Sequence, residues 1–313
     1  GIEGKVRNLQ IYNQPAEKAV AGQRAAVNLQ GVETSAVERG DVLVHPDTLA
    51  PTRMLDVYIE YLPSAERPLK NRTRQRFHIG TNLTSASIFL LDREELVPGE
   101  SGFAQLRLEA PVVALPHDRF VIRGSGVIQT LGGGVVLDAH PTRHKRNAPS
   151  VIEDLTTLRE GSHDDAVAQH IRRSGMRGIA SDDLLKRVAT SSSEVQRVIK
   201  KMIDQGEVLL IDPEKMKVID NRSYRQLREM ALAQLKEFHQ RFPMKSGLAK
   251  EELRTKLPVE VDVKLFQILL NGLIKFKEIL LEKDKLRLPT HQISSMDEKG
   301  LIKRVEEIVL KAG

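Results

Sequence analysis

The spacing of apolar residues changes near residue 145, and this change constrains the fold more than any other feature of the sequence. Before that point, short extended runs alternate apolar with polar side chains and are separated by Gly, Pro, Asn and Asp. A period of two residues is typical of β-strands. After that point, apolar residues recur every three or four positions, as in amphipathic helices. The sequence therefore predicts a β-rich half followed by an α-rich half.

Short strands are predicted throughout the first half. They lie at 5–12, 24–29, 42–45, 54–61, 76–79, 87–91, 103–108, 119–122 and 135–137. Many short strands at this spacing favour antiparallel barrels. A cluster of Pro46, Asp47 and Pro51 marks a boundary near residue 50. We interpret the glycines at 132–134 as a hairpin turn that needs positive φ, and not as a nucleotide site, because no Lys-Ser/Thr pair follows them.

The second half repeats one order of elements. Helices are predicted at 165–173, from Ser181, and at 193–205, where Gly206 ends the helix, followed by a hairpin of 208–211 with 217–219. The order recurs with helices at 224–242, 250–256 and 263–276 and a hairpin of 278–281 with 286–288. Three helices and a hairpin are typical of a winged helix. A further helix at 296–310 would begin a third unit.

These patterns predict a multidomain protein of all-β barrels followed by α-helical, winged-helix domains. The expected divisions are a partial barrel at 1–50, a complete barrel at 51–140, a basic linker at 141–160, winged helices at 161–220 and 221–290, and the start of a third at 291–313. A chain of 313 residues is long enough for about two to four domains. Because residue 1 is Gly and a strand begins almost at once, we expect a fragment of a longer protein.

Composition narrows the class of function. The net charge of +6 favours a polyanionic partner, although a solvated basic surface has the same composition. With no cysteine, the chain has no disulfides, thiolate metal sites or cysteine nucleophiles. No Ser-His-Asp order, carboxylate pair or metal-ligand spacing stands out, so we predict no catalytic residue and no metal site. No apolar run is long enough to span a bilayer, so no membrane partner is expected.

Basic side chains on the expected helices, hairpins and linker are candidates for RNA phosphate contacts. They are Arg143, Lys145, Arg146, Lys186, Arg187, Arg197, Lys200, Lys201, Lys283 and Lys285. Such side chains would position a duplex without selecting its sequence. On the helices and hairpins they could equally be the solvated faces of a spacer, and the sequence leaves both interpretations open. In the linker, we favour an ordinary solvated hinge for most of the residues, with an RNA phosphate contact as the alternative.

Several motifs of the first half resemble the SelB family of selenocysteine-specific elongation factors. For the second translation-factor domain they are 6–10, Asn13-Gln14-Pro15, Ala21-Gly22-Gln23-Arg24 and 39–43; for the third domain they are 78–81, 106–111, 118–123 and 130–134. The helical half is similar to the family's winged-helix extension, mostly in its order of elements. The alternative is an unrelated winged-helix nucleic-acid-binding regulator with a β-barrel domain, but such a regulator has no reason to carry these barrel motifs.

The resemblance implies a cytoplasmic protein that delivers selenocysteinyl-tRNA to the ribosome at UGA codons. The barrels would hold the aminoacyl end, and the winged helices would link to a hairpin in the selenoprotein mRNA. The family hydrolyses GTP, with Mg²⁺, on an N-terminal domain. We expect this chain to lack that domain, to hold no cofactor itself, and to lack the winged helix that makes the main hairpin contacts.

The resemblance also implies a role for Gly22, Gln23 and Arg24 in selenocysteinyl-tRNA binding. In the family, the Arg of this motif lies in the pocket for the selenocysteine side chain. From spacing alone, Arg24 would be a barrel-edge arginine paired with a carboxylate. The resemblance instead predicts that Arg24 faces a partly open polar pocket.

Overall fold

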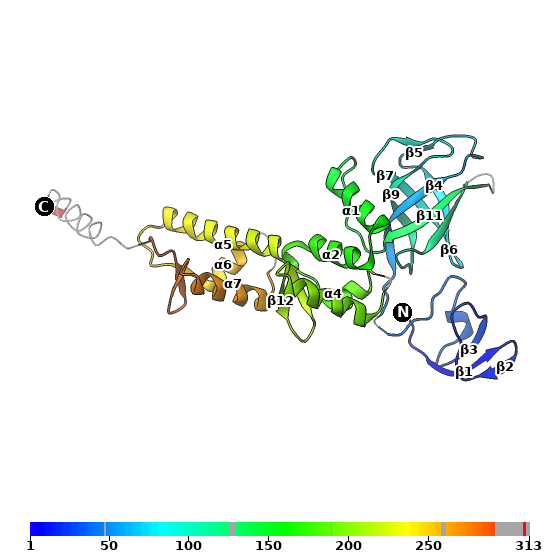
Figure 1. Cartoon of the computed structure of the whole chain (residues 1–313), viewed down its shortest axis with the longest axis horizontal. Coiled ribbons are helices and arrows are strands. Elements are labelled where there is room, and N and C mark those ends of the chain that lie inside the picture. The colour runs from blue at the N-terminus through cyan, green and yellow to red at the C-terminus, as the bar shows by residue number, and fades with distance from the viewer. Residues whose placement is uncertain (47, 125–128, 189, 258–260, 292–308, 311–313) are drawn as a thin grey trace. The chain divides into compact units, whose positions relative to one another are not determined.

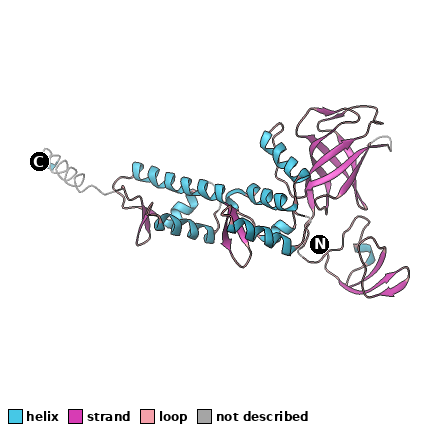
Figure 2. Ribbon diagram, in the orientation of Figure 1, coloured by secondary structure: helices cyan, strands magenta, loops and turns pink. Residues whose placement is uncertain are grey.

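The computed structural model describes residues 1–46, 48–124, 129–188, 190–257, 261–291 and 309–310. The chain forms two compact units, one of residues 1–166 with 185–189 and one of residues 167–184 with 190–313. Strands dominate the chain up to residue 138 and helices dominate it afterwards, as predicted (Figure 2). The helix predicted at 296–310 lies outside the described residues, apart from positions 309 and 310.

A small antiparallel sheet opens the chain. It consists of β1 (Lys5–Ile11), β2 (Gln14–Ala16) and β3 (Ala25–Gln30) in the order β2-β1-β3. Tyr12 and Asn13 connect β1 to β2, and both have positive φ, 51° and 64°. Two such residues make the tight hairpin turn whose twist suits the strands on either side.

The strand predicted at 42–45 does not form. Val42, Leu43 and Val44 are 50%, 60% and 39% exposed, and no described strand pairs with them. A strand is held in a sheet by hydrogen bonds between its backbone groups and those of a partner strand, and 42–45 has no such partner among the described strands. The prediction of a strand at 42–45 was therefore wrong, because it rested on the apolar run alone.

A closed antiparallel barrel follows (Figure 1). Its strands are β4 (Thr52–Tyr61), β6 (Arg74–Ile79), β7 (Asn82–Leu90), β9 (Ser101–Val112), β10 (Arg119–Arg123) and β11 (Thr130–Asp138), in the order β10-β11-β4-β9-β7-β6. The short strands β5 (Leu69–Lys70) and β8 (Glu95–Leu96) pair separately. Alternate residues point inward, so Leu55, Ile59 and Phe77 are 1% exposed or less. Each strand predicted between 54 and 137 overlaps one of these strands.

The glycines at 132–134 lie inside β11 and not in a turn, so that prediction was wrong. None of them has positive φ. A Cβ atom on Gly134 would lie 1.9 Å from the carbonyl oxygen of Tyr58, and one on Gly133 would lie 2.5 Å from that of Phe120. These glycines are therefore required because the backbones of the neighbouring strands approach closely.

A helix, α1 (Pro149–Glu160), occupies much of the segment predicted as a basic linker at 141–160. Pro149 begins it, where a missing N–H costs nothing. Leu155 and Leu158 pack with Phe103 and Leu137 of the barrel in one apolar cluster. The linker prediction was therefore wrong from residue 149 onward, because the basic run at 143–146 hid the helical spacing that follows it.

The first winged helix has the predicted order of elements. Its elements are α2 (His163–Arg173), α3 (Ser181–Leu185), α4 (Ser192–Asp204), β12 (Val208–Asp212) and β13 (Lys217–Asp220), with a short 3₁₀ turn at Gly175–Arg177. The Ser191 hydroxyl accepts a hydrogen bond from the Glu194 N–H at 3.3 Å and caps α4. Gly206, with φ of 70°, follows the helix.

The second winged helix continues without a linker. Its elements are α5 (Asn221–Arg241), β14 (Leu248–Ala249), α6 (Lys250–Lys256), α7 (Val263–Lys275), β15 (Leu280–Glu282) and β16 (Lys285–Arg287). The Asp220 carboxylate ends β13 and caps α5 by accepting from Arg222 N–H at 2.9 Å. Ile211 and Ile219 of the first hairpin belong to the apolar core of the second winged helix. The two winged helices therefore share a core. No described helix combines the length and apolar content needed to cross a bilayer.

Candidate nucleic-acid interface

The predicted tRNA-binding triplet forms a tight turn before β3. Gly22 has φ of 88°, and no atom lies within 4 Å of its Cβ position, so the backbone conformation alone favours glycine. Gln23 closes the turn: its N–H donates to Val20 C=O at 3.2 Å, and its Oε1 accepts from Val20 N–H at 3.0 Å. Arg24 follows directly and is exposed. Among the described residues, no carboxylate forms an ion pair with Arg24.

A hollow of about 500 Å³ lies on the same sheet. Asn8 and Gln10 of β1, Asn28 of β3, and Glu33 and Thr34 beyond it contribute to its lining. Arg24 does not line this hollow, so the Arg24 pocket stays a prediction. Apolar side chains, among them Val27 and Leu29 of β3, line the rest of the hollow.

The barrel carries a pair of arginines that the sequence analysis did not identify. Arg76 of β6 and Arg123 of β10 lie directly opposite each other on neighbouring antiparallel strands. Like charges in this position destabilise a sheet unless something neutralises them. Neither side chain forms an ion pair with a carboxylate among the described residues. We call Arg76, Arg123 and the adjacent His78 the β6–β10 patch.

His78 reports the positive potential of this patch. Burial lowers the pKa of His78 first, and the charges of Arg123, Arg76 and Arg39 lower it further. Its Nε2 atom is buried and has no hydrogen-bond partner. A region where several cations lower the pKa of a histidine attracts anions. Positions 76 and 123 are far apart in the sequence, and only strand pairing brings them together.

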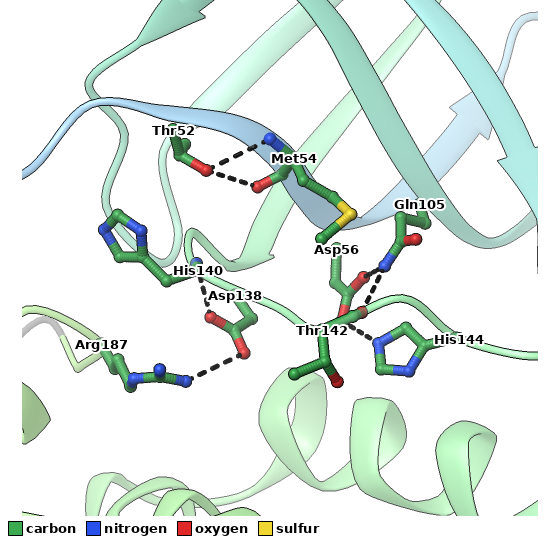
Figure 3. Close-up of polar contacts among 9 residues, drawn as sticks. All are labelled: Thr52, Met54, Asp56, Gln105, Asp138, His140, Thr142, His144 and Arg187. Carbon is green, nitrogen blue, oxygen red and sulfur yellow. Dashed lines mark hydrogen bonds and ion pairs between the residues drawn. The ribbon is translucent and has the colours of Figure 1, made fainter.

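A buried polar cluster holds the segment that leaves the barrel (Figure 3). Asp56 of β4 is fully buried, with His144 Nε2 2.6 Å from its Oδ2 and Gln105 Nε2 donating to its Oδ1 at 2.9 Å. Gln105 also donates to the Thr142 carbonyl at 2.9 Å. These bonds satisfy a carboxylate that would be costly to bury alone, and they fix residues 142–144 on the barrel.

Asp138 lies beside Asp56 on the adjacent strand and is also fully buried. Its Oδ1 accepts from the His140 N–H at 2.8 Å, and Arg187 Nη1 lies 4.0 Å from its Oδ2 (Figure 3). Burial is the main cause of the lowered pKa of His140. Arg187, predicted as a phosphate contact, is therefore turned toward an internal carboxylate.

The other predicted phosphate contacts occupy different settings. Arg146 pairs with Glu94, and Arg197 pairs with Glu194 at 2.9 Å on the same helix. Arg143, Lys145, Lys200, Lys201 and Lys283 are exposed, Lys186 is half-buried, and the exposed Lys285 donates to Ser246 Oγ at 3.2 Å. Lys200 and Lys201 lie on α4, whereas Lys283 and Lys285 lie on the second hairpin. Within the described part of the chain, no group of three or more His, Cys, Asp or Glu side chains could hold a metal ion.

The fold defines the class: a protein with a small antiparallel sheet and a closed β-barrel followed by tandem winged helices. Two family comparisons match its parts. Residues 56–143 match the "Selenocysteine-specific elongation factor, beta-barrel domain", and residues 232–288 match "Elongation factor SelB, winged helix".

Individual proteins extend the match over the whole chain. The chain is 33% identical to the selenocysteine-specific elongation factor of Desulfomicrobium baculatum, over 100% of this chain and 49% of that protein. It is 26% identical to that of Escherichia coli (strain K12), over 95% of this chain and 45% of that protein. The chain thus spans about half the length of the curated relatives it matches.

A solved structure shows the same fold. A bacterial selenocysteine-specific elongation factor, EF-Sec, matches with a TM-score of 0.70 at 20% identity, covering 100% of this chain and 47% of that one. Together, these matches confirm the resemblance to the SelB family of selenocysteine-specific elongation factors that the barrel motifs indicated.

Proposed function

We propose that this chain is part of a selenocysteine-specific elongation factor and takes part in delivering selenocysteinyl-tRNA to ribosomes at UGA codons. The observation that carries this proposal is the 33% identity to one such factor over the whole chain. The separate matches in the barrel and in the second winged helix support it. A winged-helix regulator with an unrelated β-barrel would not account for the barrel match. GTP and Mg²⁺ as cofactors, and a cytoplasmic location, belong to the same proposal for the whole factor.

The parts of the chain have different roles in this proposal. The N-terminal sheet and the barrel hold the tRNA, with the β6–β10 patch against its phosphates, because two facing arginines without carboxylate partners favour a polyanion. The shared core of the winged helices makes them a stiff connection toward the mRNA hairpin.

Arg24 gives the proposal a chemical basis for selectivity. A selenol is more acidic than a thiol, whose pKa is about 8.5, so selenocysteine is anionic at neutral pH. Serine, carried by the precursor tRNA, is neutral. An arginine that keeps its proton at every physiological pH discriminates between the two by charge. The turn of Gly22 and Gln23 fixes the backbone from which Arg24 projects.

The test compares two tRNAs on an elongation factor that contains this chain. We expect Arg24→Ala to weaken selenocysteinyl-tRNA binding about tenfold, the effect of removing one charge-assisted hydrogen bond, and to leave seryl-tRNA binding nearly unchanged. Arg7→Ala, at an exposed arginine of β1 in the same sheet, is the matched control and should leave the ratio of the two tRNA affinities unchanged. Equal losses for both tRNAs, or no loss for either, would contradict the role of Arg24.

A further inference from the structure

A basic hollow lies on the barrel, beside the end of β7 and the middle of β9. Its volume is about 650 Å³. Its lining includes Arg72, in the loop after β5, Phe89 of β7, and Gln105 and Arg107 of β9, with His144 and Arg146 from the segment after β11. We call it the Arg107 hollow. It lies on the barrel that is proposed above to hold the tRNA, but its lining includes neither Arg24 nor any residue of the β6–β10 patch.

Arg107 is held in place and only partly satisfied. Its guanidinium carbon lies 3.9 Å from the centre of the Phe89 ring, a stacked arrangement that orients the planar group. Its Nε atom is buried and has no hydrogen-bond partner. A buried donor without an acceptor is costly, so an acceptor that enters the hollow would be favoured.

Arg72 reaches the hollow from a strained position. Its φ is 65°, a left-handed conformation that usually belongs to Gly or Asn. Backbone hydrogen bonds impose it: Arg72 N–H donates to Ile88 C=O at 2.7 Å, and Thr73 N–H donates to Lys70 C=O at 3.3 Å. These hydrogen bonds fix the backbone from which the Arg72 side chain reaches the hollow.

Arg143 completes a group of three cations. Arg143 does not itself line the hollow, but it directly precedes His144, which does. Burial lowers the pKa of Arg107, and the positive charges of Arg143 and then Arg72 lower it further. Among the described residues, none of the three forms an ion pair with a carboxylate. Arg146, which also lines the hollow, is paired with Glu94. The Asp56 cluster fixes the segment that carries Arg143 through His144 and Thr142.

We propose that Arg72, Arg107 and Arg143 form a binding site for a phosphate group. Guanidinium groups bind phosphate oxygens through paired hydrogen bonds, and three of them without counter-charges balance a phosphate well. The hollow is much larger than one phosphate ion, so it accommodates a phosphate within an RNA backbone. Neither the β6–β10 patch nor Arg24 belongs to this site. The proposal of a phosphate site does not depend on a role of the chain in selenocysteine incorporation.

The test uses the whole chain and two probes. A fluorescein-labelled RNA duplex is titrated by anisotropy at several salt concentrations, and inorganic phosphate is titrated while the arginine Nε–Hε signals are followed by NMR. The variants are Arg72→Gln, Arg107→Gln and Arg143→Gln. Arg74→Gln is the matched control, because Arg74 lies on the same barrel, carries the same charge, and is already paired with Glu109.

We expect Arg107→Gln to weaken RNA binding about tenfold, and the salt slope of log K to fall by about 0.9 for each RNA phosphate that the variant no longer neutralises. Arg107→Lys should restore only part of the affinity, since an ammonium lacks the paired donors. A shift of the Arg107 Nε–Hε signal with inorganic phosphate, without an effect of the variants on RNA, would support a free phosphate ion as the ligand.

The proposal would be wrong if Arg74→Gln lost as much RNA affinity as Arg107→Gln. It would also be wrong if neither RNA nor inorganic phosphate shifted the Arg107 Nε–Hε signal. Arg72 and Arg143 are exposed, so their variants test the proposal even if Arg107→Gln does not fold.

Discussion

At the scale of single residues, Gly134 shows how strand packing can demand glycine without a turn. Its Cβ position lies 1.9 Å from the Tyr58 carbonyl oxygen and 3.0 Å from the Phe120 ring. An alanine there would push two barrel strands apart. We expect Gly134→Ala to lower the free energy of unfolding by about 3 kcal/mol, as overpacking does in other cores. Urea denaturation followed by circular dichroism measures this.

Gly80 provides the control for that substitution. It lies in the turn between β6 and β7 with φ of 53°, and no atom lies within 4 Å of its Cβ position. Gly80→Ala therefore adds backbone strain alone, which costs about 1 kcal/mol. If Gly134→Ala proved no more destabilising than Gly80→Ala, the close approach of the strands would not be the reason for the glycine.

His239 makes the second winged helix sensitive to acid. Its Nε2 accepts from Leu288 N–H at 3.2 Å, and its ring stacks on His291 with centroids 3.8 Å apart. Burial lowers the pKa of His239, and His291 and Arg287 lower it further. The unfolded chain therefore binds this proton more readily than the folded chain. Stability is complete above about pH 6.5, the ordinary pKa of histidine, and is lost as pH falls through the folded-state pKa.

Thermal unfolding between pH 7.5 and 5 would show this loss in the wild-type chain. We expect His239→Phe to flatten the acid side of the curve while lowering stability at neutral pH, because Leu288 N–H loses its acceptor. His163→Gln, at an exposed histidine, should leave the curve unchanged. An unaltered acid side in His239→Phe would rule out His239 as the titrating group.

At the scale of elements, two reciprocal ion pairs join the winged helices. Lys217 of β13 lies 2.9 Å from Asp262, and Lys264 of α7 lies 2.6 Å from Asp212. Asp262 also caps α7 by accepting from the Lys264 N–H at 2.8 Å. The hydrogen bond from Lys217 is the main cause of the lowered pKa of Asp262. This carboxylate therefore connects the two hairpin-and-helix units directly.

Asp262→Ala removes both the cap and the ion pair. We expect it to lower the free energy of unfolding by about 1 to 2 kcal/mol, whereas Lys217→Met should cost less than about 1 kcal/mol because the pair is partly solvated. Denaturant melts of both variants measure the difference. Asp284→Ala, at an exposed carboxylate 3.5 Å from Lys250, is the control. Equal effects of Asp262→Ala and Lys217→Met would mean that the cap contributes nothing.

At the scale of the whole molecule, the net charge is +6, and basic residues occur on several elements. Lys200 and Lys201 of α4 are exposed, and lysines that contact phosphates position a nucleic acid without selecting its bases. RNA binding by the helical half should therefore be weak and tolerant of sequence. We expect the affinity for two unrelated RNA duplexes to be similar and to fall at least about tenfold between 50 and 200 mM salt.

Anisotropy titrations of the chain and of a Lys200→Gln/Lys201→Gln variant check this expectation. The variant should bind both duplexes more weakly by the same factor and show a smaller salt slope. Tight binding that survives raised salt, or a strong preference for one duplex, would show that base contacts dominate.

GTP provides a separate test of the whole chain. No Gly-rich loop followed by Lys-Ser/Thr occurs in the sequence, and such a loop is what cradles nucleotide phosphates in translation factors. We expect no saturable binding of a fluorescent GTP analogue and no GTP hydrolysis by this chain. Saturable affinity would reveal a nucleotide site of another kind.

The sequence by itself determined the kind and order of most elements. Helix α6 at Lys250–Lys256 was predicted with the observed bounds, and strand β6 contains the predicted run of 76–79. Both predictions rest on the spacing of apolar side chains, because the periods of a helix and of a strand can be recognised within a few residues. The barrel motifs also indicated the family, since they are local in the sequence.

Tertiary structure alone decided what those elements bring together. It made 132–134 a strand where backbones nearly touch, and it left 42–45 without a partner strand among the described residues. It set Arg76 opposite Arg123 and gathered Arg72, Arg107 and Arg143. The physical reason is that these contacts depend on strand register and on the path of a connecting segment. Neither leaves a periodic signal, because the residues that meet are separated by tens of positions along the chain.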